Sequence, residues 1–152
     1  MALILIVDDD ELVVEMVAEA LRPLGHAIGT LDDGLHVIDI VHLKRPALVI
    51  LDCSMPMLSG IDALRQIRTS ALCFDTPVMM LTGRRSVADE EIAIRAGAND
   101  YMRKPFDMAK LVARTDTLLL KAAWRPDVTM KTSLPAAPGR ATLRQRPPAQ
   151  IG

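Results

Sequence analysis

Apolar residues in the first 124 positions occur in two alternating arrangements. Largely apolar runs of five or six residues occupy positions 3–7, 47–51 and 77–82, and weaker strand signals lie at 27–31 and 100–102. Between these runs, apolar residues recur every three or four positions, which is the spacing of an amphipathic helix. Because unbroken apolar strands need burial on both faces, five strands alternating with five helices predict a parallel sheet covered on both sides.

The helical spacing also predicts which side chains face the core. Ser59 with Asp62 and Ser86 with Asp89 have the spacing of helix caps, and Pro23 with Gly25 ends the first helix. The predicted inner positions, helix by helix, are Leu12, Val13, Met16, Val17, Ala20 and Leu21; Leu35, Ile38 and His42; Ile61, Leu64 and Ile67; and Met108, Leu111, Val112, Thr115, Leu118, Leu119 and Ala122.

Composition divides the chain into two parts. The net charge of −1 is the balance of +4 in residues 125–152, which hold five basic residues and one acidic residue, and −5 in residues 1–124. The segment 125–152 also contains five prolines and no aromatic residue, so it cannot bury enough surface to fold. We therefore expect one folded domain over 1–124 and a Pro/Arg-rich disordered tail over 125–152, which could also be a linker to an output domain missing from this chain.

Other features of the sequence bear on the compartment. No apolar run approaches the length of a membrane span, and the first residues have no basic segment or cleavage site of a signal peptide. The two cysteines, Cys53 and Cys73, match no metal or redox spacing. These observations predict a cytoplasmic protein that does not engage membranes. The basic tail without aromatics is a weak footprint for nucleic acid, and none is expected as a partner.

Polar residues with complementary chemistry follow several of the predicted strands. Asp8, Asp9 and Asp10 follow the first strand, Asp52 ends the third, Thr82 and Gly83 end the fourth, and Lys104 with Pro105 follows the fifth. In open parallel sheets, sites lie outside the carboxyl ends of the strands. Carboxylates gathered there would repel one another and favour a hard cation such as Mg²⁺, whose remaining positions stay open to phosphate oxygens. This pattern predicts phosphoryl transfer to a carboxylate.

Four blocks of sequence resemble the receiver domain of two-component response regulators. They are ILIVDDDE, LVILDCSMPMLSGIDALRQIR, PVMMLTGR and AGANDYMRKPF, and they occur in this order over about residues 2–123. The resemblance implies a flavodoxin-like α/β fold, a (βα)5 doubly wound parallel sheet with strand order 2-1-3-4-5. Periodicity alone does not give that order.

The resemblance also implies a role for each matching residue. Asp52 would accept the phosphoryl group, and Mg²⁺ would be bound by Asp8, Asp9, Asp52 and the backbone carbonyl of Ser54. Thr82 and Lys104 would bind phosphoryl oxygens, and Gly83 would leave the site open. The Lys104–Pro105 peptide bond would be cis. Tyr101 would change rotamer together with Thr82 and so act as a switch.

The implied partners are a sensor histidine kinase or histidine phosphotransfer protein and a downstream protein effector. The three histidines lie on separate elements without ligand spacing, so the phosphoryl donor is expected on another protein. Asp100, Arg103 and Arg114 could support a charge-paired homodimer that depends on phosphorylation, and a monomer is equally open. We expect a regulatory phosphoacceptor that promotes its own phosphorylation and dephosphorylation, not an enzyme.

Three alternatives remain at this stage. The chain could be a receiver fragment of a larger regulator, or a scaffold that works without phosphorylation. A phosphatase of the haloacid-dehalogenase kind would have a second aspartate two residues after the nucleophile, where this chain has Ser54. Cys53 lies next to Asp52, which suggests a redox role. Alternation along a strand, however, directs the Cys53 side chain to the face opposite to that of Asp52, so a redox role is not expected.

Overall fold

The structure is a computed structural model that describes residues 2–83 and 87–123. The expected cap at Ser86, the end of the domain at Trp124 and the tail over 125–152 lie outside the described residues. Every strand and helix predicted from the sequence is present within the described ranges.

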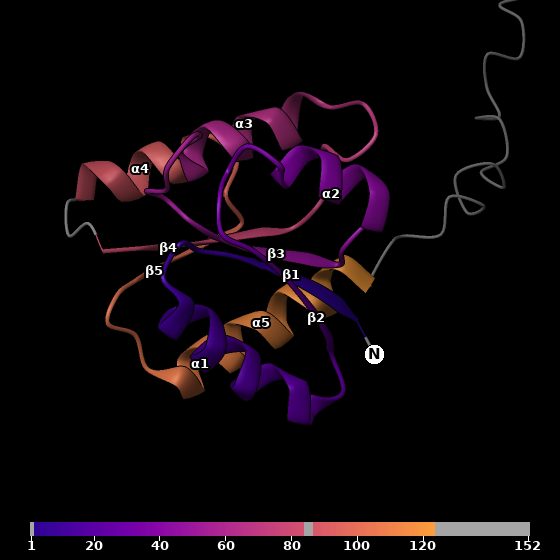
Figure 1. Cartoon of the computed structure of the whole chain (residues 1–152), viewed down its shortest axis with the longest axis vertical. Coiled ribbons are helices and arrows are strands. Elements are labelled where there is room, and N and C mark those ends of the chain that lie inside the picture. The colour runs from indigo at the N-terminus through magenta and orange to yellow at the C-terminus, as the bar shows by residue number, and fades with distance from the viewer. Residues whose placement is uncertain (1, 84–86, 124–152) are drawn as a thin grey trace, which may run out of the picture.

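Five parallel strands form one sheet in the order β2-β1-β3-β4-β5, which is the predicted order (Figure 1). Three of these strands, β1, β3 and β4, lie in the interior of the sheet and are almost entirely buried. Continuous apolar runs are found at these positions because both faces of an interior parallel strand are covered. The strand bounds are β1 Leu3–Val7, β2 Ala27–Leu31, β3 Leu48–Asp52, β4 Val78–Thr82 and β5 Asp100–Arg103.

Helices cover both faces of the sheet and enclose two apolar cores (Figure 1). The helices α2, α3 and α4 lie on one face, and α1 and α5 lie on the other. In the described part of the chain, no helix is both long enough and apolar enough to cross a bilayer. The helix bounds are α1 Glu11–Leu21, η1 Arg22–Leu24, α2 Val37–Lys44, α3 Gly60–Thr69, α4 Val87–Arg95 and α5 Met108–Ala123.

The predicted inner faces are right for α3 and α5 and partly wrong for α1 and α2. On α1, Leu12 and Met16 are 68% and 48% exposed, because the helix turns Val17, Ala18 and Leu21 toward the sheet instead. The small side chain of Ala18 takes a position facing the sheet, and a residue of this size permits a close approach of the helix. The apolar face of α1 is therefore wider than its core contact.

A similar shift occurs on α2. This helix begins at Val37 and buries Val37 and Val41, whereas Leu35 precedes the helix and is 46% exposed. Leu35, predicted to face the core from this helix, lies before its start because the Asp33 carboxylate accepts hydrogen bonds from the backbone N–H groups of Leu35 and His36, which form a turn.

The start of α3 fixes the end of β3, where the candidate phosphoacceptor lies. The Gly60 N–H donates to the Cys53 carbonyl at 2.9 Å, and a Cβ atom at position 60 would stand 1.8 Å from the Asp52 carbonyl oxygen. Glycine is thus required by the close approach of two backbones. As predicted, Ser59 caps α3, since its hydroxyl accepts from the Asp62 N–H at 3.2 Å.

The loop between β3 and α3 contains one strained residue. Met57 has φ of +70° although it is not glycine, and its side chain is 77% exposed. A left-handed conformation costs a residue with a Cβ about 1–2 kcal/mol. We expect Met57→Gly to raise the free energy of unfolding by about 0.5–1 kcal/mol, after the greater chain entropy of glycine is subtracted.

Urea unfolding would measure this gain, with Met57→Ala as the matched control. Alanine keeps the Cβ atom and removes the same exposed side chain, so its stability should stay at or below that of the wild type. Equal stabilisation by both substitutions would contradict the assignment of strain to the backbone.

Candidate functional site

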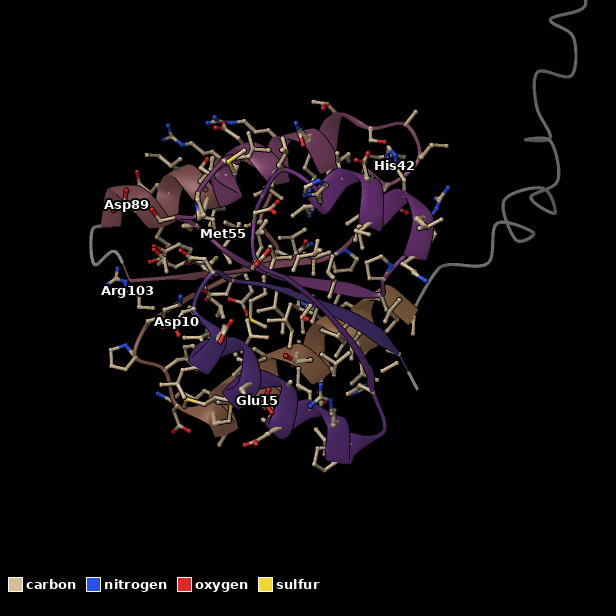
Figure 2. The ribbon with its side chains drawn as sticks, in the orientation of Figure 1. Asp10, Glu15, His42, Met55, Asp89 and Arg103 are labelled. Carbon is tan, nitrogen blue, oxygen red and sulfur yellow. The ribbon has the colours of Figure 1, made fainter. Side chains whose placement is uncertain are left out.

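The candidate site lies at the carboxyl ends of β1, β3 and β4, which are neighbours in the sheet. Asp8 follows the last residue of β1, Asp52 is the last residue of β3, and Thr82 is the last residue of β4. The register pairs Val7 with Leu51 and Asp52 with Leu81, so these residues end their strands at nearly the same height. Figure 2 shows Asp10, Met55 and Arg103 at this edge of the sheet, whereas His42 lies toward the opposite edge.

Three carboxylates meet at this edge. One oxygen from each of Asp8, Asp9 and Asp52 lies within 4.8 Å of the others, and Asp8 and Asp52 are 1% and 5% exposed. Oxygens bound to one Mg²⁺ at about 2.1 Å are at most about 4.2 Å apart, so small side-chain rotations would bring all three onto one ion. Their chemistry suits the ion as well, because Mg²⁺ prefers carboxylate oxygens and keeps some of its waters.

Lys104 supplies the positive charge within the site. Its Nζ donates to Asp8 Oδ2 at 2.6 Å and to Asp52 Oδ1 at 3.3 Å. Its backbone N–H donates to the Thr82 carbonyl at 2.6 Å, and the Lys104–Pro105 peptide bond is cis. Three carboxylates and one ammonium leave the site a formal charge of −2, which a single divalent cation would neutralise.

The carboxylates and the ammonium shift one another's pKa values. Burial, together with the negative charge of Asp8, raises the pKa of Asp52 to about 6, and the Lys104 ammonium opposes this rise. Burial alone would lower the pKa of Lys104, but its contacts with Asp8 and Asp52 outweigh burial and raise it. Near neutral pH, Asp52 is therefore ionised although burial and the charge of Asp8 destabilise its carboxylate, and Lys104 is protonated.

The predicted switch residues lie beside this cluster. Thr82 is 1% exposed and Tyr101 is 5% exposed, so both side chains point into the protein. The Tyr101 hydroxyl makes no hydrogen bond with the described residues, although the Thr82 hydroxyl is near enough to oppose the rise that burial causes in the Tyr101 pKa. A buried hydroxyl that makes no hydrogen bond is unfavourable, so a change of rotamer that gives it a partner would lower the free energy.

The remaining predicted residues lie around the opening of the site. Asp9 and Ser54 are exposed, and a Cβ atom at the exposed Gly83 would meet no described atom within 4 Å. Asp10 is a helix cap, since its carboxylate accepts from the Leu12 N–H at 3.0 Å. Cys53 packs into the core with α2, α3 and α4, on the side of the sheet opposite to the one that Ile50 faces.

Sequence reasoning missed two features of the site. The shortest ion pair of Lys104 is with Asp8, and Asp8 also accepts from the Asp10 N–H at 2.9 Å, which holds its carboxylate in place. Gly60 was not singled out, although a glycine directly after the cap residue Ser59 was a usable signal. Both features concern how the acidic side chains are positioned.

Comparison with known proteins identifies the family. The model of the response regulator receiver domain matches residues 4–116. The chain belongs to this family. The response regulator MprA of Mycobacterium sp. (strain KMS) is 38% identical over 120 residues, which cover 79% of this chain and 51% of MprA. MprA of Mycolicibacterium vanbaalenii is 39% identical over 116 residues, covering 76% of this chain and 49% of that protein. The receiver chain thus spans about half the length of these relatives.

Solved receiver structures agree with the fold. The receiver domain of the sensor histidine kinase PA1611 from Pseudomonas aeruginosa PAO1, with magnesium coordinated in its active site cleft, matches with a TM-score of 0.72 and 30% identity over 78% of this chain and 97% of that chain. The Vibrio cholerae chemotaxis protein CheY4 matches with a TM-score of 0.72 and 27% identity over 78% of this chain and 98% of that chain. The fold is therefore the flavodoxin-like fold of receiver domains.

Proposed function

We propose that this receiver domain accepts a phosphoryl group on Asp52, in a Mg²⁺-dependent reaction, and responds by changing a protein-interaction surface. The observation that supports this most directly is the cluster of Asp8, Asp9, Asp52 and Lys104 at the carboxyl ends of the strands. The donor would be a phosphohistidine of a sensor kinase or phosphotransfer protein, and we place the reaction in the cytoplasm, where two free cysteines suit the reducing conditions.

The proposed transfer has a simple balance. A carboxylate oxygen of Asp52 attacks phosphorus, a P–O bond forms, the P–N bond of the phosphohistidine breaks, and the imidazole of the donor leaves with the electron pair. Asp52 is ionised at neutral pH because its pKa lies near 6, so it is ready to act as the nucleophile. Water attacking the acyl phosphate would later regenerate the carboxylate.

The other residues of the site have separate tasks. Asp8, Asp9, Asp52 and the Ser54 carbonyl would hold Mg²⁺, whose charge offsets that of the phosphoryl oxygens when it is bound. Lys104 already contacts Asp52 and can redirect a hydrogen bond to a phosphoryl oxygen. Thr82 would bind a second oxygen and draw Tyr101 with it, which would change the surface formed by α4, β5 and α5.

This surface already contains ion pairs within the chain. Arg114 donates to Asp100 at 3.1 Å and to the Tyr101 carbonyl at 3.0 Å, and Arg103 contacts Glu90 at 3.4 Å. The three residues expected to pair across a homodimer thus have partners in the monomer, and exposed ion pairs of this kind exchange at little cost. A downstream effector or a second copy could take over these charges, so a homodimer that depends on phosphorylation stays a prediction.

The first test is the intact mass of the purified chain after incubation with acetyl phosphate, with and without Mg²⁺. We expect one added phosphoryl group that requires Mg²⁺. A folded chain that gains no phosphoryl group under conditions where another receiver domain does would overturn the proposal and favour a scaffold that works without phosphorylation.

Exposed apolar residues near the site offer a contact surface to a donor protein. Leu12 and Met16, one helical turn apart on α1, are 68% and 48% exposed, and α1 begins directly after the acidic cluster. A protein that brings its histidine to Asp52 must cover the surroundings of the site. We propose that it covers this part of α1.

Replacing Leu12 and Met16 with glutamate is expected to slow phosphotransfer from the cognate kinase about tenfold or more, because apolar anchors contribute a large share of binding energy. Phosphorylation by acetyl phosphate should be unchanged, since this small donor needs no docking surface. Leu43→Glu on α2, where the side chain is 73% exposed, is the matched control and should leave both rates unchanged. Equal slowing with both donors would instead indicate damage to the site.

The relatives continue for about as many residues again as this chain covers. That the chain is a receiver fragment of a larger regulator stays a prediction, and so does the absence of nucleic acid among its partners.

A further inference from the structure

A half-buried arginine near the end of α3 joins separate segments of the chain. Arg68 donates from Nε to the Gly97 carbonyl at 2.9 Å and from Nη2 to the Asn99 side chain at 2.8 Å. Its Nη1 donates to the Phe74 and Thr76 carbonyls at 3.0 and 2.5 Å. These bonds use most of the donor capacity of a guanidinium. The acceptors lie in the α3–β4 and α4–β5 loops, which lead into two neighbouring strands of the sheet.

The starts of β4 and β5 meet at one of these acceptors. The Asn99 side-chain oxygen, which accepts from Arg68, also accepts from the Val78 N–H at 2.8 Å. In return, the Asn99 N–H donates to the Val78 carbonyl at 2.8 Å. Val78 is the first residue of β4, and Asn99 directly precedes β5. One guanidinium and one carboxamide therefore fix how the two strands begin.

The end of α4 also rests on Arg68. Gly97 lies just after α4, has φ of +106°, and donates from its N–H to the Ile94 carbonyl at 3.0 Å. A Cβ atom at position 97 would stand 2.9 Å from Cγ and from Nε of Arg68. Glycine suits both the left-handed backbone and the close approach. A shift of this helix end would therefore break contacts of Arg68.

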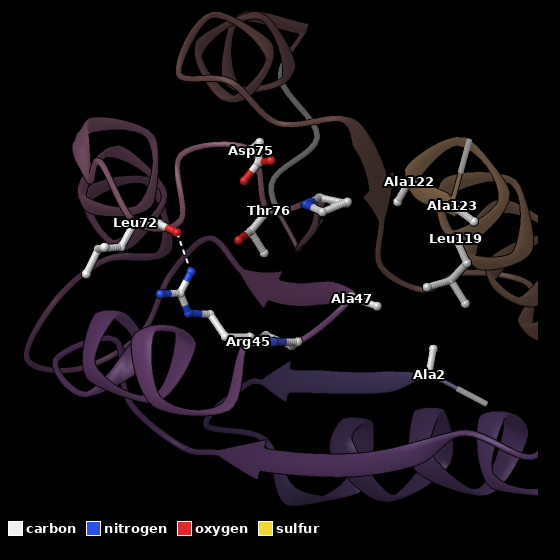
Figure 3. Close-up of a pocket in the computed structure, with 11 residues that line it drawn as sticks. Ala2, Arg45, Ala47, Leu72, Asp75, Thr76, Leu119, Ala122 and Ala123 are labelled. Atoms are coloured by element: carbon white, nitrogen blue, oxygen red, sulfur yellow. Dashed lines mark hydrogen bonds between the residues drawn. The ribbon is translucent and has the colours of Figure 1, made fainter. Parts of the chain in front are cut away.

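A second arginine holds the α3–β4 loop from the side of α2. Arg45, directly after α2, donates to the Leu72 carbonyl at 2.6 Å, the bond drawn in Figure 3, and from Nε to the His42 carbonyl at 3.1 Å. Thr76, also labelled in Figure 3, belongs to the same loop, and its carbonyl is one that Arg68 binds. The loop is thus fastened to two helices, which gives Arg68 a rigid frame to hold against.

All of these bonds lie at the edge of the sheet opposite to the candidate site. Val78 and Thr82 are the first and last residues of β4, so about 13 Å of strand separates the two edges. We propose, building on the proposed phosphorylation of Asp52, that Arg68 is a positioning residue for the response. It keeps the starts of β4 and β5 and the end of α4 in place while the ends of the strands at Thr82 and Lys104 move.

Backbone amide signals in NMR spectra of the full chain, with and without acetyl phosphate and Mg²⁺, test the proposal. In the wild type, phosphorylation should shift the Thr82 signal and leave those of Val78, Gly97 and Asn99 unchanged. In Arg68→Met these three signals should shift as well. Their hydrogen exchange should also be about tenfold faster without acetyl phosphate, because a lost bond to a charged donor favours local opening by about this factor.

Arg65→Met is the matched control. Arg65 lies one helical turn earlier on α3, is exposed and pairs with Asp62 at 3.2 Å, so the variant removes the same charge from the same helix. It should behave as the wild type in both measurements. If circular dichroism shows that Arg68→Met is unfolded, Arg68→Lys takes its place. Lysine keeps the charge and the stem, but its donors all lie on one nitrogen and cannot reach both loops.

Two results would overturn the proposal. One is a phosphorylation-dependent shift at Val78 and Asn99 of the wild type as large as that at Thr82, and the other is wild-type exchange in the Arg68 variants. Intact mass of the same samples separates this from the proposed function, since a chain that gains no phosphoryl group contradicts that function. The comparison of exchange between the Arg68 and Arg65 variants needs no phosphoryl group and still decides whether Arg68 holds these ends in place.

Discussion

Asp52→Asn is expected to abolish the Mg²⁺-dependent gain of a phosphoryl group from acetyl phosphate. Two properties are lost together. The amide is not a nucleophile toward phosphorus at neutral pH, and the cluster with Asp8 and Asp9 loses one of its three carboxylates. The loss should be complete in intact-mass measurements, because Asp52, the last residue of β3, is the single proposed phosphoacceptor.

Asp62→Asn is the matched control for this substitution. Asp62 lies exposed in the first turn of α3 and pairs with Arg65 at 3.2 Å, so the variant makes the same change of charge near the site without touching it. It should retain the full gain in mass. An adduct that persists in Asp52→Asn and maps to another residue would contradict the assignment of the phosphoacceptor.

Asp52→Asn is also expected to stabilise the Mg²⁺-free protein at neutral pH. Its effect on the free energy of unfolding should be about 3 kcal/mol more favourable at neutral pH than at low pH. The pKa of Asp52 rises from 3.8 to about 6 on folding, chiefly through burial and the charge of Asp8. Each unit of such a shift corresponds to about 1.4 kcal/mol. Folding therefore favours the protonated carboxyl group, and ionised Asp52 destabilises the native state.

The sign follows from proton linkage. Between pH 3.8 and about pH 6 the folded state holds a proton on Asp52 that the unfolded state has lost, so the stability that this group contributes falls as the pH rises. Above pH 6 the cost is fully present, and below pH 3.8 it vanishes. Asparagine does not titrate, and the 2.6 Å contact between Lys104 and Asp8 does not involve position 52, so the variant should retain it.

Urea unfolding of both proteins across this range measures the effect as a difference, which cancels the titration of the other groups that the proteins share. The stability of Asp52→Asn minus that of the wild type should grow from pH 4 to pH 7 in the absence of Mg²⁺. Adding Mg²⁺ at pH 7 should reduce it, because the ion binds the folded wild type. A difference that is independent of pH would contradict the raised pKa.

The apolar pattern predicted the strands and helices correctly because it reports burial, and burial decides both. It did not predict which of several apolar neighbours on a helix faces inward. On α1 the residues Leu12, Val13, Met16 and Val17 satisfy the helical period in two phases, and contact with the sheet and α5 selects the phase that buries Val17 with Ala18 and Leu21. Strand order came from the family resemblance and not from periodicity.

The acidic cluster could be anticipated because parallel strands end at one edge of the sheet, so Asp8 and Asp52 had to be neighbours once β1 and β3 were. The contacts that orient these side chains could not be predicted from the sequence. The preference of Lys104 for Asp8 depends on the path of the chain after β5, and that path is set by packing between residues far apart in the sequence.

The contact between Gly60 and β3 makes the two flanks of the candidate site mechanically unequal. On the α3 flank, two backbones meet with no space for even a methyl group, so the Asp52 main chain rests against a fixed support. On the β4 flank, a Cβ atom at Gly83 would meet no described atom within 4 Å, and the Tyr101 hydroxyl has no hydrogen-bond partner among the described residues. A phosphoryl group on Asp52 would therefore displace the β4 flank more easily than the α3 flank. The resulting conformational change would be directed toward β4 and β5.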